Sequence, residues 1–227
     1  MQEDEALDLK TIIESLFDVV GYKPSSSPQS WNVDDGHDGV VFASIIKKAV
    51  SLVEFCYFNH SFHVKLVFAL YCWFFFYIDD SADKLSLEDY QRRLLLRYPQ
   101  EDPVLEHFHE VLGRLYDHWD PVCANSMTCA ALEFLSGTIL ENRLDISSMT
   151  ARSSAPNWPK YLREKSGMAP GFSCAVFPAS THTDISAYIQ ILPDIASYFY
   201  LANDILSCVN CFARHVTDTY FVAGQVL

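Results

Sequence analysis

Three aspartates stand close together where a long apolar segment of the chain ends. Residues 71–78 are aromatic or otherwise uncharged, Asp79 and Asp80 follow them directly, and Asp83 comes three residues after Asp80. On a helix, Asp79 and Asp83 lie about one turn apart on the same face. Carboxylate oxygens suit Mg²⁺, which keeps waters that a substrate phosphate can replace. The spacing predicts half of a metal-bound phosphate site; the alternative is a buried helix that ends in a solvated acidic turn.

A second set of oxygen-bearing side chains lies near the end of the chain. Apolar residues recur at helical spacing from residue 184 to Phe199, and the same face continues to Asn203 and Ser207. Each step of four residues advances a helix by about 6 Å, so Asn203, Ser207 and position 211 would line up beside one ion. These side chains are candidates for the second half of the metal site.

The two motifs together resemble those of the class I terpenoid cyclases, and most closely the trichodiene synthase family of fungi. Residues 79–83 (Asp-Asp-Ser-Ala-Asp) resemble its aspartate-rich motif, and residues 203–207 (Asn-Asp-Ile-Leu-Ser) resemble the start of its Asn/Ser/Glu metal motif. Residues 161–163 resemble the segment whose Arg binds diphosphate, and residues 132–134 lie in a similar helix. The likeness covers roughly residues 40–207. Chain-elongating prenyltransferases usually carry a second Asp-Asp-x-x-Asp motif instead, so the pattern favours cyclisation.

The resemblance implies a helical bundle around a deep apolar cavity, three Mg²⁺ ions, and farnesyl diphosphate or a similar prenyl diphosphate as substrate. Arg163 would bind the diphosphate, and with Asp79 it would have a catalytic role in its departure, which leaves an allyl cation. Asp80 has a second interpretation, as the partner of a cation on another helix. The implied metal ligands are Asp79, Asp80, Asp83, Asn203 and Ser207.

Three residues on the helical turns before Asp79 are candidates for lining the cavity, where aromatic faces would stabilise a migrating positive charge. They are Cys72, Phe75 and Phe76. The alternative for each of them is ordinary core packing. The resemblance also suggests a homodimer.

The resemblance stops after Ser207. Asn210 and Cys211 stand where the family has a Lys and then a Glu, and a thiol is a poor Mg²⁺ ligand. We expect an incomplete synthase domain at residues 1–207, without the family's later helices, and an atypical tail at residues 208–227. Two alternatives follow. One is a truncated relative without turnover that binds diphosphate weakly or not at all, and the other is an unrelated helical interaction protein with coincidental motifs.

Apolar residues at helical spacing dominate the chain, without the punctuation that hairpins require, so we expect an all-α fold. Pro121 is expected to break the chain, and Pro193 to kink the last helix. Expected helices cover residues 9–20, 40–78 (as two helices), a stretch from Asp102-Pro103, 125–142 (with Met127, Ala131, Phe134 and Leu135 inward) and a stretch from 184. Expected loops or irregular passages cover residues 25–39, 147–159 and 167–178.

Composition excludes several other classes of protein. A net charge of −13 and a pI near 4.9 argue against a nucleic-acid surface, which needs clustered Lys and Arg. The acidic first residues lack the features of a secretory signal, and the uncharged run at residues 66–78 is shorter than the ~18–20 residues of a membrane span. We therefore expect a cytoplasmic protein with no membrane span.

Cysteine and histidine patterns predict no further metal site. The chain has seven cysteines, which we expect to be reduced. Cys208 and Cys211 form a Cys-x-x-Cys pair, but a zinc site needs a second pair of ligands. His107, His109 and His118 lack matching Cys or carboxylate partners and are expected at the surface.

Overall fold

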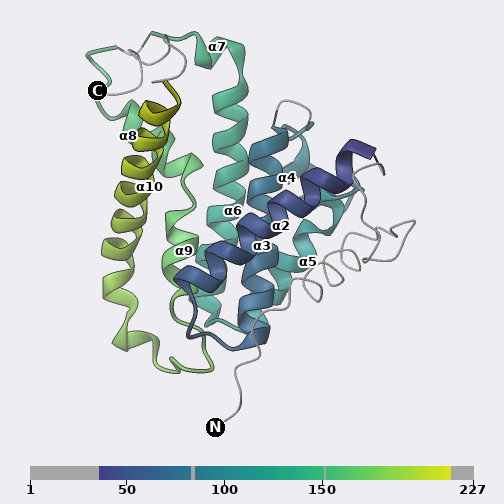
Figure 1. Cartoon of the computed structure of the whole chain (residues 1–227), viewed down its shortest axis with the longest axis vertical. Coiled ribbons are helices and arrows are strands. Elements are labelled where there is room, and N and C mark those ends of the chain that lie inside the picture. The colour runs from purple at the N-terminus through teal and green to yellow at the C-terminus, as the bar shows by residue number, and fades with distance from the viewer. Residues whose placement is uncertain (1–35, 83–84, 151, 216–227) are drawn as a thin grey trace.

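The computed structural model describes residues 36–82, 85–150 and 152–215, and every regular element in these ranges is a helix (Figure 1). The predicted all-α class is thus confirmed. The predicted helix at residues 9–20 lies outside the described residues, as does Asp83. The α-helices are α2 (Gly36–Cys56), α3 (Phe62–Ser81), α4 (Tyr90–Leu96), α5 (Phe108–Arg114), α6 (Pro121–Asn142), α7 (Leu144–Ser147), α8 (Trp158–Ser166), α9 (Ala169–Ala175) and α10 (Leu192–His215). Short 3-10 helices are η2 (Leu105–His107), η3 (Leu115–Asp117), η4 (Ile185–Ala187) and η5 (Ile189–Ile191).

Helix α3 forms the centre of the core. Most of its side chains are buried, and its ring systems contact α5 and α6. Phe74 stacks on Phe108 with ring centroids 4.8 Å apart, and Phe75 meets Phe134 edge-on at 5.1 Å. Among the described helices, α3 is long and apolar enough to cross a membrane. However, most of its side chains are buried inside the protein, as in a core helix. The predicted pair of helices in residues 40–78 is confirmed as α2 and α3, with a turn at residues 57–61 between them.

Prolines begin helices here, which corrects three of our predictions. Pro121 was expected to break the chain, but it occupies the first turn of α6, and the Asp120 carboxylate caps that turn by accepting the Val122 N–H at 2.8 Å. Pro193 lies in the first turn of α10 and therefore does not kink it. Pro170 likewise lies in the first turn of α9, within residues expected to be irregular. A proline fits there because the first N–H groups of a helix have no intrahelical partner.

Asp102 caps a turn as predicted, but the first helical element after it, η2, begins at Leu105 and not at Pro103, and the stripe that follows is split. The Asp102 carboxylate accepts the N–H groups of Val104 at 2.8 Å and Leu105 at 2.9 Å. The chain then forms η2, α5 and η3 in place of one continuous helix. The inward residues predicted for α6 are all buried: Met127, Ala131, Phe134 and Leu135.

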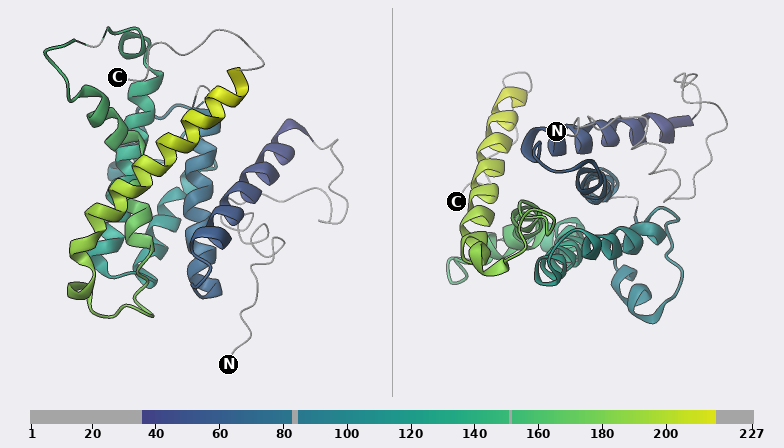
Figure 2. Two further views of the ribbon diagram at one scale, coloured as in Figure 1. Left: turned by 60° about the vertical axis from the view of Figure 1, so that its left-hand side comes forward. Right: turned by 90° about the horizontal axis from the view of Figure 1, so that it is seen from below.

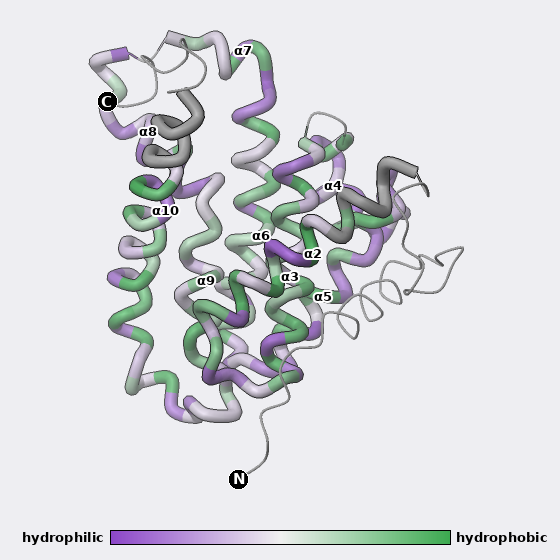
Figure 3. Tube along the Cα trace, viewed as in Figure 1, coloured by the Kyte–Doolittle hydropathy of each residue, from purple (hydrophilic) through white to green (hydrophobic). Residues whose placement is uncertain are grey.

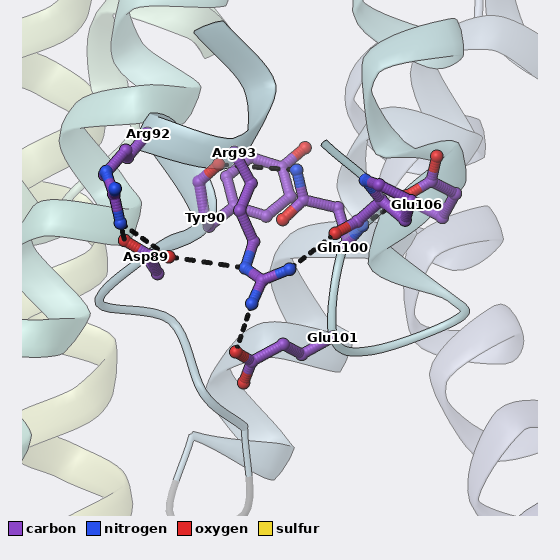
Figure 4. A network of polar contacts seen from close by, with 8 residues as sticks. Asp89, Tyr90, Arg92, Arg93, Gln100, Glu101 and Glu106 are labelled. Atoms are coloured by element: carbon purple, nitrogen blue, oxygen red, sulfur yellow. Dashed lines mark hydrogen bonds and ion pairs between the residues drawn. The ribbon is translucent and has the colours of Figure 1, made fainter. Parts of the chain in front are cut away.

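A polar network holds the connection between α4 and η2 (Figure 4). Arg93 donates to the Pro99 carbonyl at 2.8 Å and to the Glu101 carboxylate at 2.7 Å, and it also pairs with Asp89. The Gln100 side chain donates to the Tyr90 carbonyl at 3.3 Å. These side-chain bonds hold residues 99–101 against the start of α4.

Helices α8, α9 and α10 cover one side of α6 (Figures 1 and 2). Helix α9 packs against both α6 and α10, and α8 packs against α6. Gly137 permits the close approach of α8, because a Cβ at this position would lie 2.8 Å from the backbone of Lys165. This packing brings α8 alongside the half of α10 that carries the second predicted motif.

Candidate functional site

Asp79 and Asp80 end the central helix with carboxylates that reach solvent. The Lys48 ammonium of α2 donates to Asp80 at 2.7 Å, in agreement with the second interpretation of Asp80 as the partner of a cation. Partial burial raises the pKa of Asp79, the neighbouring Asp80 adds to this effect, and Lys48 opposes it. In the described ranges, Asp79 has no cationic side chain within ion-pair distance. The end of α3 thus carries an acidic pair in which only one member is neutralised.

The second predicted motif meets the predicted diphosphate-binding residue. Arg163 of α8 donates from Nε to the Asp204 carboxylate at 2.7 Å and from Nη2 to the Asn203 side-chain oxygen at 2.8 Å. Its guanidinium also lies over the ring of Tyr200, 5.3 Å from the ring centroid. The structure therefore brings Arg163 and Asn203 together, although they are separated by 40 residues in the sequence. Ser207 lies one turn further along α10, and its side chain is exposed.

Sequence reasoning missed Asp204 and Tyr200. Position 204 is rotated by about 100° from Asn203 on a helix and therefore lies off the line of the candidate ligands Asn203 and Ser207. That rotation points Asp204 at α8 and so creates its contact with Arg163. The available signal was the i, i+4 spacing of Tyr200 and Asp204, which puts an aromatic ring and a carboxylate on one helix face.

Two further contacts fix α8 in this position. Lys165 donates to the Glu133 carboxylate of α6 at 2.7 Å and lies over the Tyr161 ring at 5.6 Å. Gly167, just after α8, has no room for a side chain, because a Cβ there would collide with the Tyr200 ring. The end of α8 is therefore held between α6 and α10, with Arg163 on the α10 side.

Both predicted motifs lie toward the same end of the molecule. Helices α3 and α10 start at one end and run in the same general direction (Figures 1 and 2), and each carries its motif in its C-terminal half. The described residues contain no group of three or more His, Cys, Asp or Glu side chains that could hold a metal ion. The candidate ligands that can be placed, Asp79, Asp80, Asn203 and Ser207, offer only oxygen atoms. This donor chemistry fits Mg²⁺.

The candidate cavity-lining residues belong to the packed interior. Cys72 and Phe75 are buried, whereas Phe76 is partly buried against the core. Phe75 contacts Tyr71 edge-on at 4.6 Å, in addition to its contact with Phe134. Their lining of a reaction cavity therefore stays a prediction.

Two surface hollows lie elsewhere. One, of about 230 Å³, lies between the residues after α3 and the end of α6, and includes Leu85 and Thr138 in its walls. The other, of about 300 Å³, lies beside the turn between α2 and α3, and includes His60 and His182. Neither is lined by any of the predicted site residues.

The cysteines that the structure describes are free thiols. Cys72, Cys123 and Cys174 are buried, whereas Cys56 and Cys129 are exposed. The side chains of Cys208 and Cys211 lie outside the described residues. The Nδ1 atom of His107 lies 3.1 Å from the Glu110 carboxylate.

Comparison with known proteins gives one family. The model of the trichodiene synthase family matches residues 37–223. Terpene synthase BipA of Cochliobolus sativus is 38% identical over 163 residues, which cover 71% of this chain and 50% of that protein. Monoterpene synthase 25 of Postia placenta is 27% identical, covering 73% and 52%, and an (E)-beta farnesene synthase of Metarhizium brunneum is 29% identical, covering 64% and 45%. The chain spans about half the length of the curated relatives it matches.

The family match covers both motifs and Arg163, together with most of the segment after Ser207. The domain boundary at residue 207 therefore stays a prediction. Coincidental motifs in an unrelated helical protein are excluded, because 38% identity over 163 residues and a match to most of the chain require common descent. The chain belongs to the trichodiene synthase family.

Proposed function

We propose that this chain is the part of a Mg²⁺-dependent sesquiterpene synthase that ionises farnesyl diphosphate for cyclisation, with release of diphosphate. The observation that carries the proposal is the contact of Arg163 with Asn203 and Asp204, which joins two motifs of a trichodiene synthase family member. The name of one relative, the (E)-beta farnesene synthase of Metarhizium brunneum, supports a C15 product.

The chain's own residues have distinct tasks in this proposal. Arg163 would bind diphosphate oxygens, for which a planar guanidinium with parallel N–H groups is suited. Asp79, Asn203 and Ser207 would hold metal, together with Asp83 and, when released from Lys48, Asp80. When bound, Mg²⁺ supplies positive charge that stabilises the departing diphosphate. Phe75 and Phe76 would face the resulting cation from the apolar side.

Cys211 supports a second candidate function, which is diphosphate binding without turnover. A thiol stands at the third ligand position of the second motif, and thiols are poor ligands for Mg²⁺. This second candidate function shares diphosphate binding with the first, but it lacks ionisation and cyclisation of the substrate.

One experiment separates the two candidates. The 227-residue chain is incubated with farnesyl diphosphate, with Mg²⁺ or with EDTA, and Arg163→Ala is the matched control. Release of diphosphate and volatile hydrocarbons are measured by a coupled assay and gas chromatography. Mg²⁺-dependent production of a cyclic hydrocarbon supports the synthase, whereas Mg²⁺-dependent binding of farnesyl diphosphate without release of diphosphate supports the second candidate. Absence of Mg²⁺-dependent binding would contradict both.

A further inference from the structure

The guanidinium of Arg163 is used on one edge only. It has five N–H donors, and those on Nε and Nη2 point at Asp204 and Asn203 of α10. In the part of the chain that the structure describes, Nη1 donates no hydrogen bond. The edge formed by Nη1 and the second hydrogen of Nη2 therefore has no hydrogen-bond acceptor among the described residues, and two parallel N–H groups on that edge match two oxygens of a phosphate.

The flat face of the guanidinium is also held. The ring of Tyr200 lies under it, and the Tyr200 hydroxyl donates to the Glu164 carbonyl of α8 at 3.3 Å. Tyr200 precedes Asp204 by four residues on α10, so ring and carboxylate contact Arg163 from the same helix face. The ring restricts the tilt of the guanidinium, and the carboxylate restricts its rotation about the axis of the side chain.

These contacts matter because an arginine side chain has many rotamers when it is unrestrained. Arg163 is only partly accessible, with 29% of its side chain exposed. If the side chain were unrestrained, a diphosphate would have to fix its conformation on binding, and the lost conformational entropy would weaken the binding. The negative charge of Asp204 acts against diphosphate binding, since it lowers the positive potential that attracts an anion. The balance between ordering and neutralisation decides whether Asp204 helps or hinders binding.

We infer that Asp204 and Tyr200 are positioning residues that hold the Arg163 guanidinium with its free edge presented to a diphosphate. The inference rests on the proposed function for the identity of the anion. Asp204 acts through its hydrogen bond to Nε, and Tyr200 acts through its ring. In this role, neither residue would contact the diphosphate or the metal.

The test measures Mg²⁺-dependent binding of inorganic diphosphate to the 227-residue chain by calorimetry. Asp204→Ala should raise Kd on the order of tenfold, while Asp204→Asn, which keeps an oxygen acceptor for Nε–H, should stay within about threefold of wild type. Tyr200→Leu should weaken binding, and Tyr200→Phe, which keeps the ring, should not. The matched control is Asp194→Asn, which removes an exposed carboxylate from the first turn of α10.

A second measurement needs no ligand. In the ¹⁵N spectrum of the free chain, the Arg163 Nε–H signal, assigned with Arg163→Lys, should exchange slowly with water, and Asp204→Ala should accelerate that exchange on the order of tenfold. Unchanged exchange in Asp204→Ala would overturn the inference. Tighter or equal diphosphate binding by Asp204→Ala would overturn it too, while the proposed function stands. Wild-type binding no tighter than that of Arg163→Ala would overturn the proposed function and the inference together.

Discussion

Asp79 and Asp80 are adjacent carboxylates with different surroundings. Asp80 forms a 2.7 Å ion pair with Lys48, whereas the pKa of Asp79 is raised by partial burial and by the negative charge of Asp80. A cation that binds at the end of α3 therefore gains most from the carboxylate that is not already neutralised. At the residue scale, this asymmetry predicts unequal roles for two residues that look equivalent in the sequence.

Asp79→Asn should weaken Mg²⁺ binding on the order of tenfold or more, because it removes the charge that attracts the ion and keeps the size of the side chain. Asp80→Asn should have a smaller effect, since Lys48 already neutralises that carboxylate. Calorimetric titration with Mg²⁺ in the presence of diphosphate measures both variants, and circular dichroism checks that each is folded. A larger loss in Asp80→Asn would reverse the assignment.

At the scale of elements, close helix contacts depend on positions where a side chain has no room. Gly171 of α9 lies against the Tyr71 hydroxyl of α3, and that hydroxyl donates to the Met127 carbonyl of α6 at 2.7 Å. A single tyrosine thus joins three helices, and a glycine makes room for it.

Gly171→Ala should destabilise the protein by about 1–3 kcal/mol, because the new Cβ would lie 2.6 Å from the Tyr71 hydroxyl and displace it from its buried hydrogen bond. The matched control is Gly113→Ala in α5, where no atom lies within 4 Å and alanine should stabilise by up to about 1 kcal/mol. Urea unfolding measures both variants. Equal effects at the two positions would show that the contact with Tyr71 is unimportant.

The contact between α9 and the turn before α3 depends on pH because it involves His60. Its Nε2 lies 2.8 Å from the Ala175 carbonyl. Burial lowers the pKa of His60, the Ala175 hydrogen bond opposes this, and His182 and Lys65 add to the lowering. The unfolded chain therefore binds the His60 proton at higher pH than the folded chain does. This contribution to stability is complete above the unfolded pKa of about 6.5 and decreases as the pH falls toward the lowered folded value.

The melting temperature should accordingly fall more steeply for wild type than for His60→Gln as the pH is lowered from about 7.5 to about 5.5. Glutamine can still donate to the Ala175 carbonyl but does not titrate, so the difference between the two slopes isolates the histidine. Differential scanning calorimetry in buffers of constant ionic strength gives the slopes. Parallel slopes would exclude this role for His60.

At the scale of the whole molecule, α10 leaves much of its apolar surface exposed. Tyr198, Leu201 and Ile205 lie at helical spacing and are 67%, 63% and 63% exposed. Figure 3 shows apolar residues recurring along this helix at the edge of the molecule. Contiguous apolar surface of this kind favours association, which bears on the homodimer that the resemblance suggests.

We predict that the 227-residue chain self-associates as its concentration rises and that Leu201→Lys shifts the equilibrium toward monomer. The control is Leu144→Lys in α7, since Leu144 is equally apolar and 85% exposed but lies away from α10. Sedimentation velocity at several concentrations measures the association. A monomer at every concentration, or an equal effect of both variants, would contradict the role of α10.

Local information in the sequence was enough for the fold class and for the long helices α2, α3, α6 and α10. The periodicity of residues 40–78 and the cap at Asp102 act within a few residues, so they could be interpreted without tertiary contacts. The role of each proline could not, because the same residue breaks a helix or begins one according to where the first turn falls. Helix α9 was missed for that reason.

The sequence by itself also named candidate residues for holding a metal, from residue type and spacing along one helix, and Arg163 for holding a diphosphate, from the family resemblance; these assignments stay predictions. Only the tertiary structure decided how they pair. Lys48 meets Asp80 across 32 residues, and Arg163 meets Asp204 across 41. Such contacts depend on how α2 packs on α3 and how α8 and α9 pack between α6 and α10. That packing is set by the shapes of many buried side chains together, and no motif of a few residues contains it.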